Sequence, residues 1–391
     1  MELRYTVSIQ LGLTFAVSAI ANAAPPSFTP LGDLPGGTFE SWAGGVSSNG
    51  EIVAGTSCSN FVYGCVYEAF LWQGGLKTGL GFPSSTSPYE YSGIQAMSAD
   101  GSILAGSGSS NEGTNEPFQW QNGVFTRLGR IPGYGTNAHL TTAMSDDGQR
   151  IVGWGASADG QHNQAWLWDN GSMMGLGFLP SSSNSSANGI SGDGNVIVGG
   201  SDGQAFRWIN GAMTGLGFLP VPFPGPDVSV ESWAVSASSD GSVIVGSANA
   251  YDYNTEHSQQ EAFRWSDGVM TGLGDLPGGD FSSYATAVSA DGSVIVGYGS
   301  TSLGGAAFVW DSPNGMRDLR ELLVNAFGLN LTGWALPNVR DISADGSVIV
   351  GTGINPDGNY EAFRVVLPEP SAVSFLVFGL VMVRRRKAAS R

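Results

Sequence analysis

A phrase that recurs seven times constrains the fold of this chain more than any other feature. It reads ISADGSVIVG at residues 342–351, and its Asp-Gly or Asn-Gly glycine falls at positions 50, 101, 148, 194, 241, 292 and 346. The spacing of these glycines, 46 to 54 residues, is typical of a chain built from repeated supersecondary units.

Each repeat unit is predicted to form four short β-strands. In the sixth unit we expect strands over 285–289, 293–297, 306–310 and 315–319, with the Asp-Gly turn between the first two. Asp-Gly between apolar runs is a strong hairpin signal, because glycine accepts a positive φ. The small residues of the first strands fit a place where several strands converge. A glycine ends every second strand, which predicts a bulge or a close backbone contact.

The two ends of the repeat region complement each other. The seventh unit stops after AFRVV (362–366) without a fourth strand, whereas SFTPLGDLPGG (27–37) is a fourth-strand phrase with no unit before it. Four-stranded units of this length are typical of radial blades. We therefore predict an all-β, seven-bladed β-propeller of four-stranded blades, whose last blade is closed by the N-terminal strand, with residues 28–34 beside 362–366. An open stack of β-units is the alternative.

The phrases LGDLPGG, SADGSVIVG and AFRW resemble the HAF family of extracellular repeat proteins over residues 28–366. The resemblance implies an extracellular repeat protein and brings no established activity. Residues 316–346 resemble the terminal unit of that family and include an expected helical turn, with Leu319, Leu322, Leu323 and Phe327 on one face. The seventh unit departs from the pattern, with Val365 where the other units have tryptophan.

Residues 1–23 have the pattern of a signal peptide for the Sec route. Arg4 precedes an apolar run over 7–20, and Ala21-Asn22-Ala23 has the form of a cleavage site. A buried apolar helix is the alternative. We expect the remaining residues 24–367 to form the propeller domain.

Residues 368–391 resemble a PEP-CTERM sorting signal. The elements are Pro368, Glu369 and Pro370, an uncharged run over 371–383 that could span a thinned membrane, and a basic cluster of Arg384, Arg385, Arg386 and Lys387. The resemblance implies a transient inner-membrane anchor, processing by an exosortase, and delivery to the cell surface or the extracellular matrix. A buried C-terminal helix is the alternative.

Charge and cysteine content narrow the range of partners. The formal net charge is −17, so nucleic acid and anionic lipid are poor partners for the propeller. Cys58 and Cys65 are the only cysteines, and we expect a disulfide between them after export, with two free thiols as the alternative. No metal site is expected. Calcium at the oxygen-rich loops is the alternative, although each Asp-Gly turn offers a single carboxylate.

Aromatic residues at the starts of the first strands are the candidate binding residues. Trp42, Trp233 and Tyr284 each lie eight residues before the glycine of the turn, and Trp334 and Tyr91 lie near the equivalent position. Rings at one mouth of a propeller could stack on sugars. Hydrophobic packing at the strand starts is the alternative. The tryptophans of the AFRW phrases recur at one repeat position and are expected to pack between blades.

The sequence favours a protein without catalytic activity. No GxSxG, HExxH or phosphate-binding loop occurs, and His139, His162 and His257 lie in different units. We therefore expect an exported surface or matrix protein without a cofactor, with a structural, adhesive or ligand-binding role toward an extracellular polysaccharide or a surface protein. The alternative is a secreted polysaccharide lyase or glycosidase with its site at the propeller mouth.

Overall fold

The computed structural model describes residues 25–368 except 62–63, 84–89, 111–113, 135–138, 158–159 and 221–226. The predicted signal peptide and the predicted sorting signal, apart from Pro368, lie outside the described residues. Within the described ranges, no helix has the length and apolar character needed to span a membrane.

The described chain is all-β, and its strands follow one another in antiparallel groups of four. The first group is β2 (Ser41–Val46), β3 (Ile52–Phe61), β4 (Cys65–Gln73) and β5 (Leu76–Gly79); the second is β6 (Ser92–Met97), β7 (Ile103–Ser109), β8 (Asn115–Gln121) and β9 (Val124–Arg127). The third is β10 (His139–Met144), β11 (Arg150–Ala156), β12 (Asn163–Asp169) and β13 (Ser172–Gly175); the fourth is β14 (Ser186–Ile190), β15 (Ile197–Ser201), β16 (Gln204–Ile209) and β17 (Ala212–Gly217).

The next two groups are joined into one eight-stranded sheet. They are β18 (Val228–Ala237), β19 (Val243–Asp252), β20 (His257–Ser266) and β21 (Val269–Gly272), then β22 (Gly278–Val288), β23 (Val294–Thr301), β24 (Gly304–Asp311) and β25 (Gly315–Asp318). A single parallel bridge between Gln260 and Ser282 connects them. The strands predicted for the sixth unit therefore exist, but β22 begins at 278 rather than at the predicted 285, because its first residues pair with neighbouring strands.

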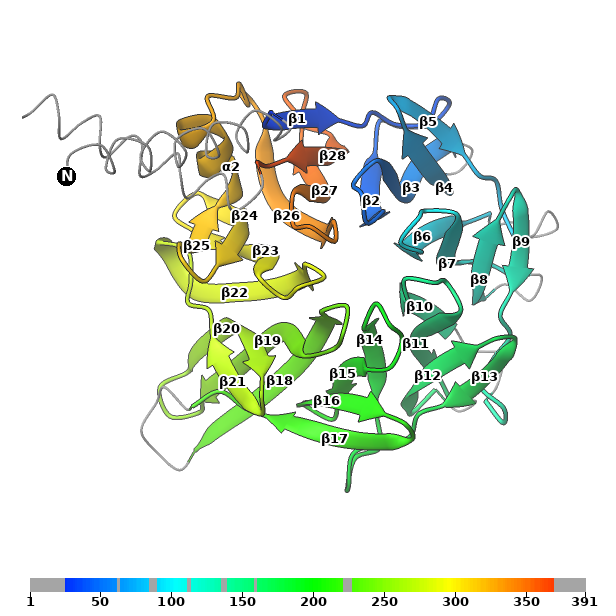
Figure 1. Ribbon diagram of the computed structural model, residues 1–391, viewed down its shortest axis with the longest axis vertical. Helices are drawn as coiled ribbons and strands as arrows, with labels where there is room; N and C mark the ends of the chain where they lie inside the picture. Colours follow the sequence, from blue (N-terminus) through cyan, green and yellow to red (C-terminus); the bar gives the residue numbers. More distant parts are fainter. Residues whose placement is uncertain are drawn as a thin grey trace, which may run out of the picture.

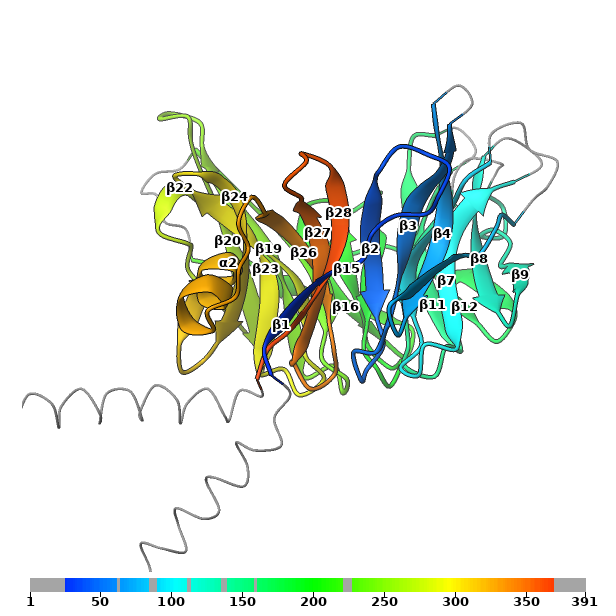
Figure 2. The same cartoon turned by 90° about the horizontal axis from the view of Figure 1, so that it is seen from above.

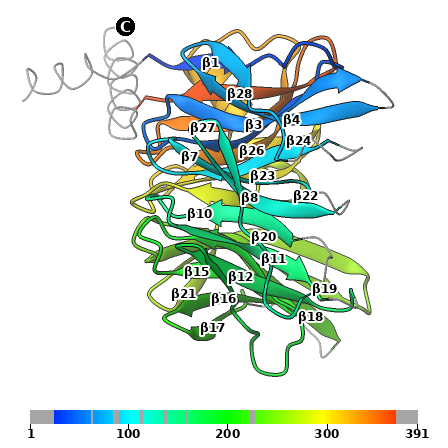
Figure 3. The same ribbon diagram turned by 90° about the vertical axis from the view of Figure 1, so that its right-hand side faces the viewer.

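The last sheet contains both ends of the described chain. β26 (Ala335–Ile342), β27 (Val348–Ile354) and β28 (Tyr360–Val366) are followed in the sheet by β1 (Ser27–Pro30). Phe28 lies opposite Val365, and the Leu31 N–H donates to the carbonyl oxygen of Ala362 at 2.9 Å. This pairing, visible in Figures 1 and 3, agrees with the predicted placement for residues 28–31, whereas the Leu34 N–H donates to Ser57 in β3.

The sheets stand side by side around a central axis, with the first strand of each group nearest the centre (Figure 1). In every unit the glycine of the second strand faces a bulge in the first strand. A Cβ on any of these glycines would lie 1.9–2.3 Å from a carbonyl oxygen of the first strand. The glycines are Gly55, Gly106, Gly153, Gly199, Gly246, Gly297 and Gly351. The close approach explains this recurring glycine. It lies inside the second strand and not at its end as predicted, since β23 continues past Gly297 to Thr301.

Hydrophobic clusters fill the spaces between adjacent sheets. Their largest members are fully buried rings from the third strands: Phe70, Phe118, Trp166, Phe206, Phe263, Phe308 and Phe363. The tryptophans of the AFRW phrases are buried or partly buried in the same clusters, as expected for packing between units: Trp72, Trp120, Trp168, Trp208, Trp265 and Trp310.

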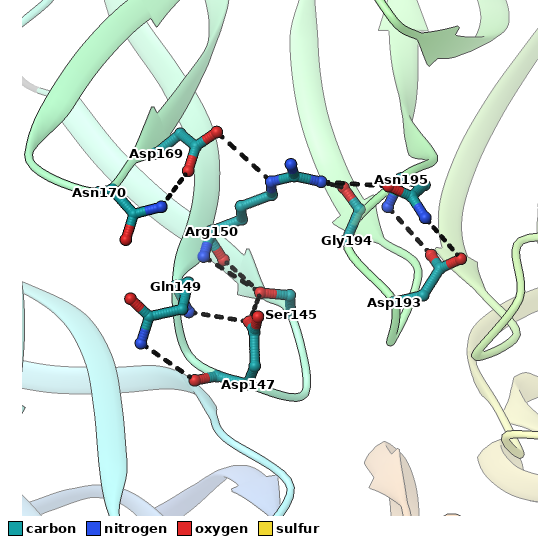
Figure 4. A network of polar contacts seen from close by, with 9 residues as sticks. All are labelled: Ser145, Asp147, Gln149, Arg150, Asp169, Asn170, Asp193, Gly194 and Asn195. Carbon is teal, nitrogen blue, oxygen red and sulfur yellow. Dashed lines mark hydrogen bonds and ion pairs between the residues drawn. The ribbon is translucent and has the colours of Figure 1, made fainter.

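The recurring Asp-Gly phrase forms a tight turn held by its own side chains. In the sixth unit the Ser289 hydroxyl donates to Asp291 at 2.7 Å and accepts the N–H of Val294 at 3.0 Å. Gly292 has φ +72°, the left-handed conformation that closes the turn. Figure 4 shows the equivalent turn around Ser145 and Asp147, where Arg150 also donates to the carbonyl oxygen of Gly194 in the next unit at 2.8 Å.

Backbone hydrogen bonds link these turns in a circuit around the axis. Each bond, 2.8–3.1 Å long, runs from an N–H in one turn to a carbonyl oxygen in the next. The donor–acceptor pairs are Ser48–Ala99, Ala99–Asp146, Asp146–Gly192, Asp193–Ser239, Ser239–Ala290, Ala290–Ala344 and Ala344–Ser48. The last bond returns to the turn in which the circuit begins.

A second contact between sheets uses the serine at the start of a first strand. Ser92 Oγ accepts the Ala69 N–H at 2.9 Å and donates to the carbonyl oxygen of Gly81 at 2.7 Å. Ser41 makes the same pair of contacts to Ala362 and Gly32. Ser185, Ser232 and Ser283 make the equivalent pair of contacts at three further junctions between sheets.

One helical insertion separates β25 from β26, on the outside of the sheets (Figures 1 and 2). It consists of α2 (Leu319–Glu321) and a π-helical turn, η1 (Leu322–Ala326), and Asp318 caps its N-terminus. Leu319 and Leu323 are fully buried, as expected for one apolar face.

Candidate functional site

The four predicted ligand-binding residues occupy four different sheet units. Trp42 lies in β2, Trp233 in β18 and Tyr284 in β22, while Trp334 directly precedes β26. All four side chains are partly buried. Each contacts its own neighbours, so the structure does not gather them into one site.

Trp42 is the member with an exposed aromatic partner. Its ring lies 5.4 Å from that of Tyr67 in an edge-on arrangement, and 6.3 Å from that of Tyr360 in a stacked one. Tyr360 is 49% exposed. Because Tyr360 begins β28, this group, which we call the Trp42 cluster (Trp42, Tyr67 and Tyr360), spans the junction between the last sheet and the first.

A carboxylate adjoins the Trp42 cluster. The Tyr67 hydroxyl donates to Glu40 Oε2 at 3.2 Å. Burial, and then the charge of Glu40, raises the pKa of Tyr67, so the phenol stays protonated and remains a donor. Phe39, 39% exposed, precedes Glu40 in the chain, and Phe61, 60% exposed, ends β3 opposite Cys65. The surface therefore combines aromatic faces with a carboxylate acceptor.

The other three candidates pack against the molecule itself. A Cβ on Gly200 would meet the Trp233 ring at 2.7 Å, so this glycine makes room for the tryptophan. Tyr284 stacks on Tyr298 at 4.8 Å. Trp334 packs edge-on against Phe28 at 4.9 Å and contacts the core beside β26.

A cavity of about 190 Å³ lies on the central axis. Its lining includes the apolar side chains of Val46, Met144 and Ile342. Asp341 lines it from the bulge of β26, where its carboxylate accepts the Val46 N–H at 2.9 Å. Burial raises the pKa of Asp341 to about 6. At the equivalent bulges the other units have small residues: Gly45, Ala96, Ala143, Gly189, Ser236 and Ala287.

Cys58 and Cys65 form a disulfide in the structure, with their Cα atoms 5.7 Å apart, in agreement with the expected pairing. Across the described ranges, no group of three or more His, Cys, Asp or Glu residues is placed to hold a metal ion. His139 is buried at the start of β10, where its Nε2 accepts the Ile131 N–H at 3.4 Å.

Sequence reasoning identified Trp42 and missed its partners. Tyr67 and Tyr360 come from the third strands of two units at opposite ends of the chain. Only the junction of the last and first sheets brings them together. Tyr67 lies in the same sheet as Trp42, so the prediction that residues 28–34 lie beside 362–366 could have indicated Tyr360 alone.

Comparison with solved structures identifies the fold. The β-propeller domain of the Trilobed protease from Pyrococcus furiosus matches 83% of this chain and 93% of its own, with a TM-score of 0.52 and 11% identity. The chain is a β-propeller. At this identity the similarity bears on the fold alone.

Two other solved structures match with lower TM-scores. TolB from Acinetobacter baumannii has a TM-score of 0.41 and 13% identity over 82% of this chain and 81% of its own. The GH74 xyloglucanase from Xanthomonas campestris has a TM-score of 0.48 and 12% identity over 84% of this chain and 52% of its own. No protein-family model and no curated protein matches the propeller chain, so the HAF and PEP-CTERM resemblances stay predictions.

Proposed function

We propose that this propeller is an exported, non-catalytic protein that binds a glycan at the Trp42 cluster. The observation that carries the proposal is the stack of Trp42 on the half-exposed Tyr360, beside Tyr67. Pyranose rings have an apolar C–H face, which packs on flat aromatic side chains at little conformational cost.

Glu40 supplies the directional part of the proposed recognition. One of its carboxylate oxygens accepts the Tyr67 hydroxyl, and a carboxylate retains further lone pairs for sugar hydroxyls. The combination favours a neutral or basic glycan over an anionic one, because the net charge of the chain is −17.

The proposed site depends on a ring of seven blades closed by the N-terminal strand. Support for that arrangement comes from the circuit of turn-to-turn hydrogen bonds, from the β1–β28 pairing, and from the contacts that Ser41 makes. Closure holds Tyr360 and Trp42 in fixed register, which lowers the entropy cost of binding.

The proposed setting is the cell surface or the extracellular matrix. The support is the resemblance of the repeats to the HAF family, the signal-peptide pattern of residues 1–23, and the resemblance of residues 368–391 to a PEP-CTERM signal. In this proposal an exosortase processes the C-terminal signal after a transient stay in the inner membrane. The expected role is adhesion or organisation of matrix polysaccharide.

A glycan array probed with the purified protein, followed by a hydrolysis assay on each glycan bound, tests this function. We expect binding without turnover, and a loss of at least about tenfold in affinity for Trp42→Ala and Tyr360→Ala. Tyr253→Ala is the matched control, since Tyr253 is 65% exposed on another sheet. Turnover would favour the alternative, a polysaccharide lyase or glycosidase. Equal loss in all three variants would contradict the Trp42 cluster as the site.

A further inference from the structure

A larger cavity lies away from the axis, where the helical insertion meets the end of the described chain. Its volume is about 700 Å³, within the range usual for small-molecule sites. Its apolar lining includes Leu273, Trp310, Leu322, Phe327 and Leu367. Leu273 and Leu367 are buried, and the other three are partly buried.

The cavity exists because the sixth unit departs from the repeat. The insertion between β25 and β26 supplies Leu322 and Phe327, which stand over the turns of the preceding strands. Trp310 occupies the repeat position that elsewhere packs between sheets, and here it also forms part of the cavity lining. The other units form their four strands without such an insertion, so the fold itself does not require the cavity.

The charged residues of the cavity lining are two arginines and one aspartate, Asp311, which gives the lining a formal charge of +1. Arg317 lines it from β25 and contacts the carboxylate of Asp311 through Nη2, while its buried Nε has no hydrogen-bond partner among the described residues. Arg264 lines it from β20 and donates from Nη1 to Ser266 at 2.6 Å. Arg264, whose one described hydrogen bond is to Ser266, retains guanidinium donors for an anionic group, and charge-assisted hydrogen bonds of this kind are strong.

We propose that this cavity binds a free fatty acid. The carboxylate accepts from the guanidinium groups of Arg317 and Arg264, and the alkyl chain packs along Trp310, Leu322 and Phe327. This complementarity distinguishes the site from the rest of the chain, because a lining with two arginines and one aspartate adjoins apolar side chains in a chain of net charge −17. The site is independent of the Trp42 cluster.

Titration of the purified full-length protein with dodecanoate tests the proposal, with binding measured by the displacement of the anionic fluorescent dye ANS. We expect saturable 1:1 binding that is at least about tenfold tighter for dodecanoate than for dodecyltrimethylammonium, which has the same alkyl chain and the opposite charge. Arg317→Gln is expected to weaken dodecanoate binding about tenfold.

Control variants separate binding from folding. Arg264→Gln removes a cation whose one described hydrogen bond is to Ser266, so it should weaken binding with the fold intact. Arg127→Gln removes a comparable ion pair, with Glu116, outside the cavity, and should leave binding unchanged.

Equal affinity for the two amphiphiles would overturn the proposal. So would unchanged dodecanoate binding in both Arg264→Gln and Arg317→Gln. Absence of saturable binding by the full chain would also overturn it, and would favour residues 369–391, which follow Pro368 at the cavity edge, as the occupant.

Discussion

At the scale of single residues, the recurring glycine of each second strand is required by the close approach of a carbonyl oxygen from the first strand. Gly297 does not have a positive φ, yet a Cβ there would lie 1.9 Å from the carbonyl oxygen of Tyr284. We expect Gly297→Ala to lower the free energy of unfolding by about 2–4 kcal/mol, measured by chemical denaturation. Gly305→Ala in β24 is the control, because its nearest neighbour would be 4.0 Å away. Equal effects would contradict the steric explanation.

Asp341 makes a prediction about pH. Burial raises its pKa from 3.8 to about 6 in the folded protein. Between these pH values the folded state binds more protons than the unfolded state, so this group makes stability fall as pH rises, and the cost is constant above about pH 6. An asparagine side chain at this position would keep an acceptor for the Val46 N–H without the charge. We therefore expect Asp341→Asn to raise the free energy of unfolding at neutral pH by about 1–3 kcal/mol.

The pH dependence of that gain is the diagnostic measurement. Denaturation of both proteins at several pH values should show the difference shrinking toward zero as pH falls to about 4. A difference that stays constant with pH, or that has the opposite sign, would show that the Asp341 carboxylate is not destabilised by burial.

At the scale of the elements, the recurring phrase is a self-contained turn. Ser289 Oγ satisfies the buried Val294 N–H and donates to Asp291. Ser289→Ala should therefore cost about 1–2 kcal/mol in a thermal or chemical denaturation experiment. Ser302, on the exposed β23–β24 connection, is the control and should tolerate alanine within about 0.5 kcal/mol. If Ser289→Ala leaves the free energy of unfolding unchanged, the two hydrogen bonds of Ser289 Oγ do not stabilise the turn.

Much of the element order could be predicted from the sequence, because each hairpin is encoded locally. The Asp-Gly turns, the packing of the AFRW tryptophans and the apolar face of Leu319 and Leu323 all follow from short-range patterns. The long start of β22 could not be predicted. Its residues 278–284 are extended because Ser282 pairs with Gln260 in the preceding group and Gly278 pairs with Thr301 in β23. The cavity at Leu322 and Phe327 was missed for the same reason: tertiary packing decides which side of the insertion faces the sheets.

At the scale of the whole molecule, Gly32, which follows β1, makes hydrogen bonds to both the last sheet and the first sheet. The Gly32 N–H donates to Glu361 Oε1 at 2.9 Å, and its carbonyl oxygen accepts from Ser41 at 2.6 Å and from Lys77. We expect Glu361→Ala to lower the free energy of unfolding by about 2–4 kcal/mol and to accelerate hydrogen exchange of the Leu31 amide.

Glu68 provides a matched control for Glu361. It accepts the Gly81 N–H at 2.8 Å, the same contact within the first sheet. Glu68→Ala should be destabilising as well, but without faster exchange at Leu31. If both variants change Leu31 equally, the junction has no separate role in retaining the N-terminal strand.

The complementary ends of the repeat region could be read from the sequence, since an orphan fourth strand and a missing one are both visible in the phrases. The Trp42 cluster could not. Trp42 and Tyr360 meet only after the last sheet docks on the first, and no local pattern marks Tyr360 as its partner.

The most direct test of the account is a disulfide across the predicted junction. Thr29 and Arg364 are directly opposite each other in β1 and β28. In the Thr29→Cys/Arg364→Cys variant, oxidation should give an intramolecular bond, detected by mass spectrometry of peptides cut under non-reducing conditions. Thr29→Cys/Thr126→Cys, which places the second cysteine in β9, should not form one. Free thiols or intermolecular dimers in the first variant would contradict the pairing of the two chain ends on which the proposed ring and glycan site depend.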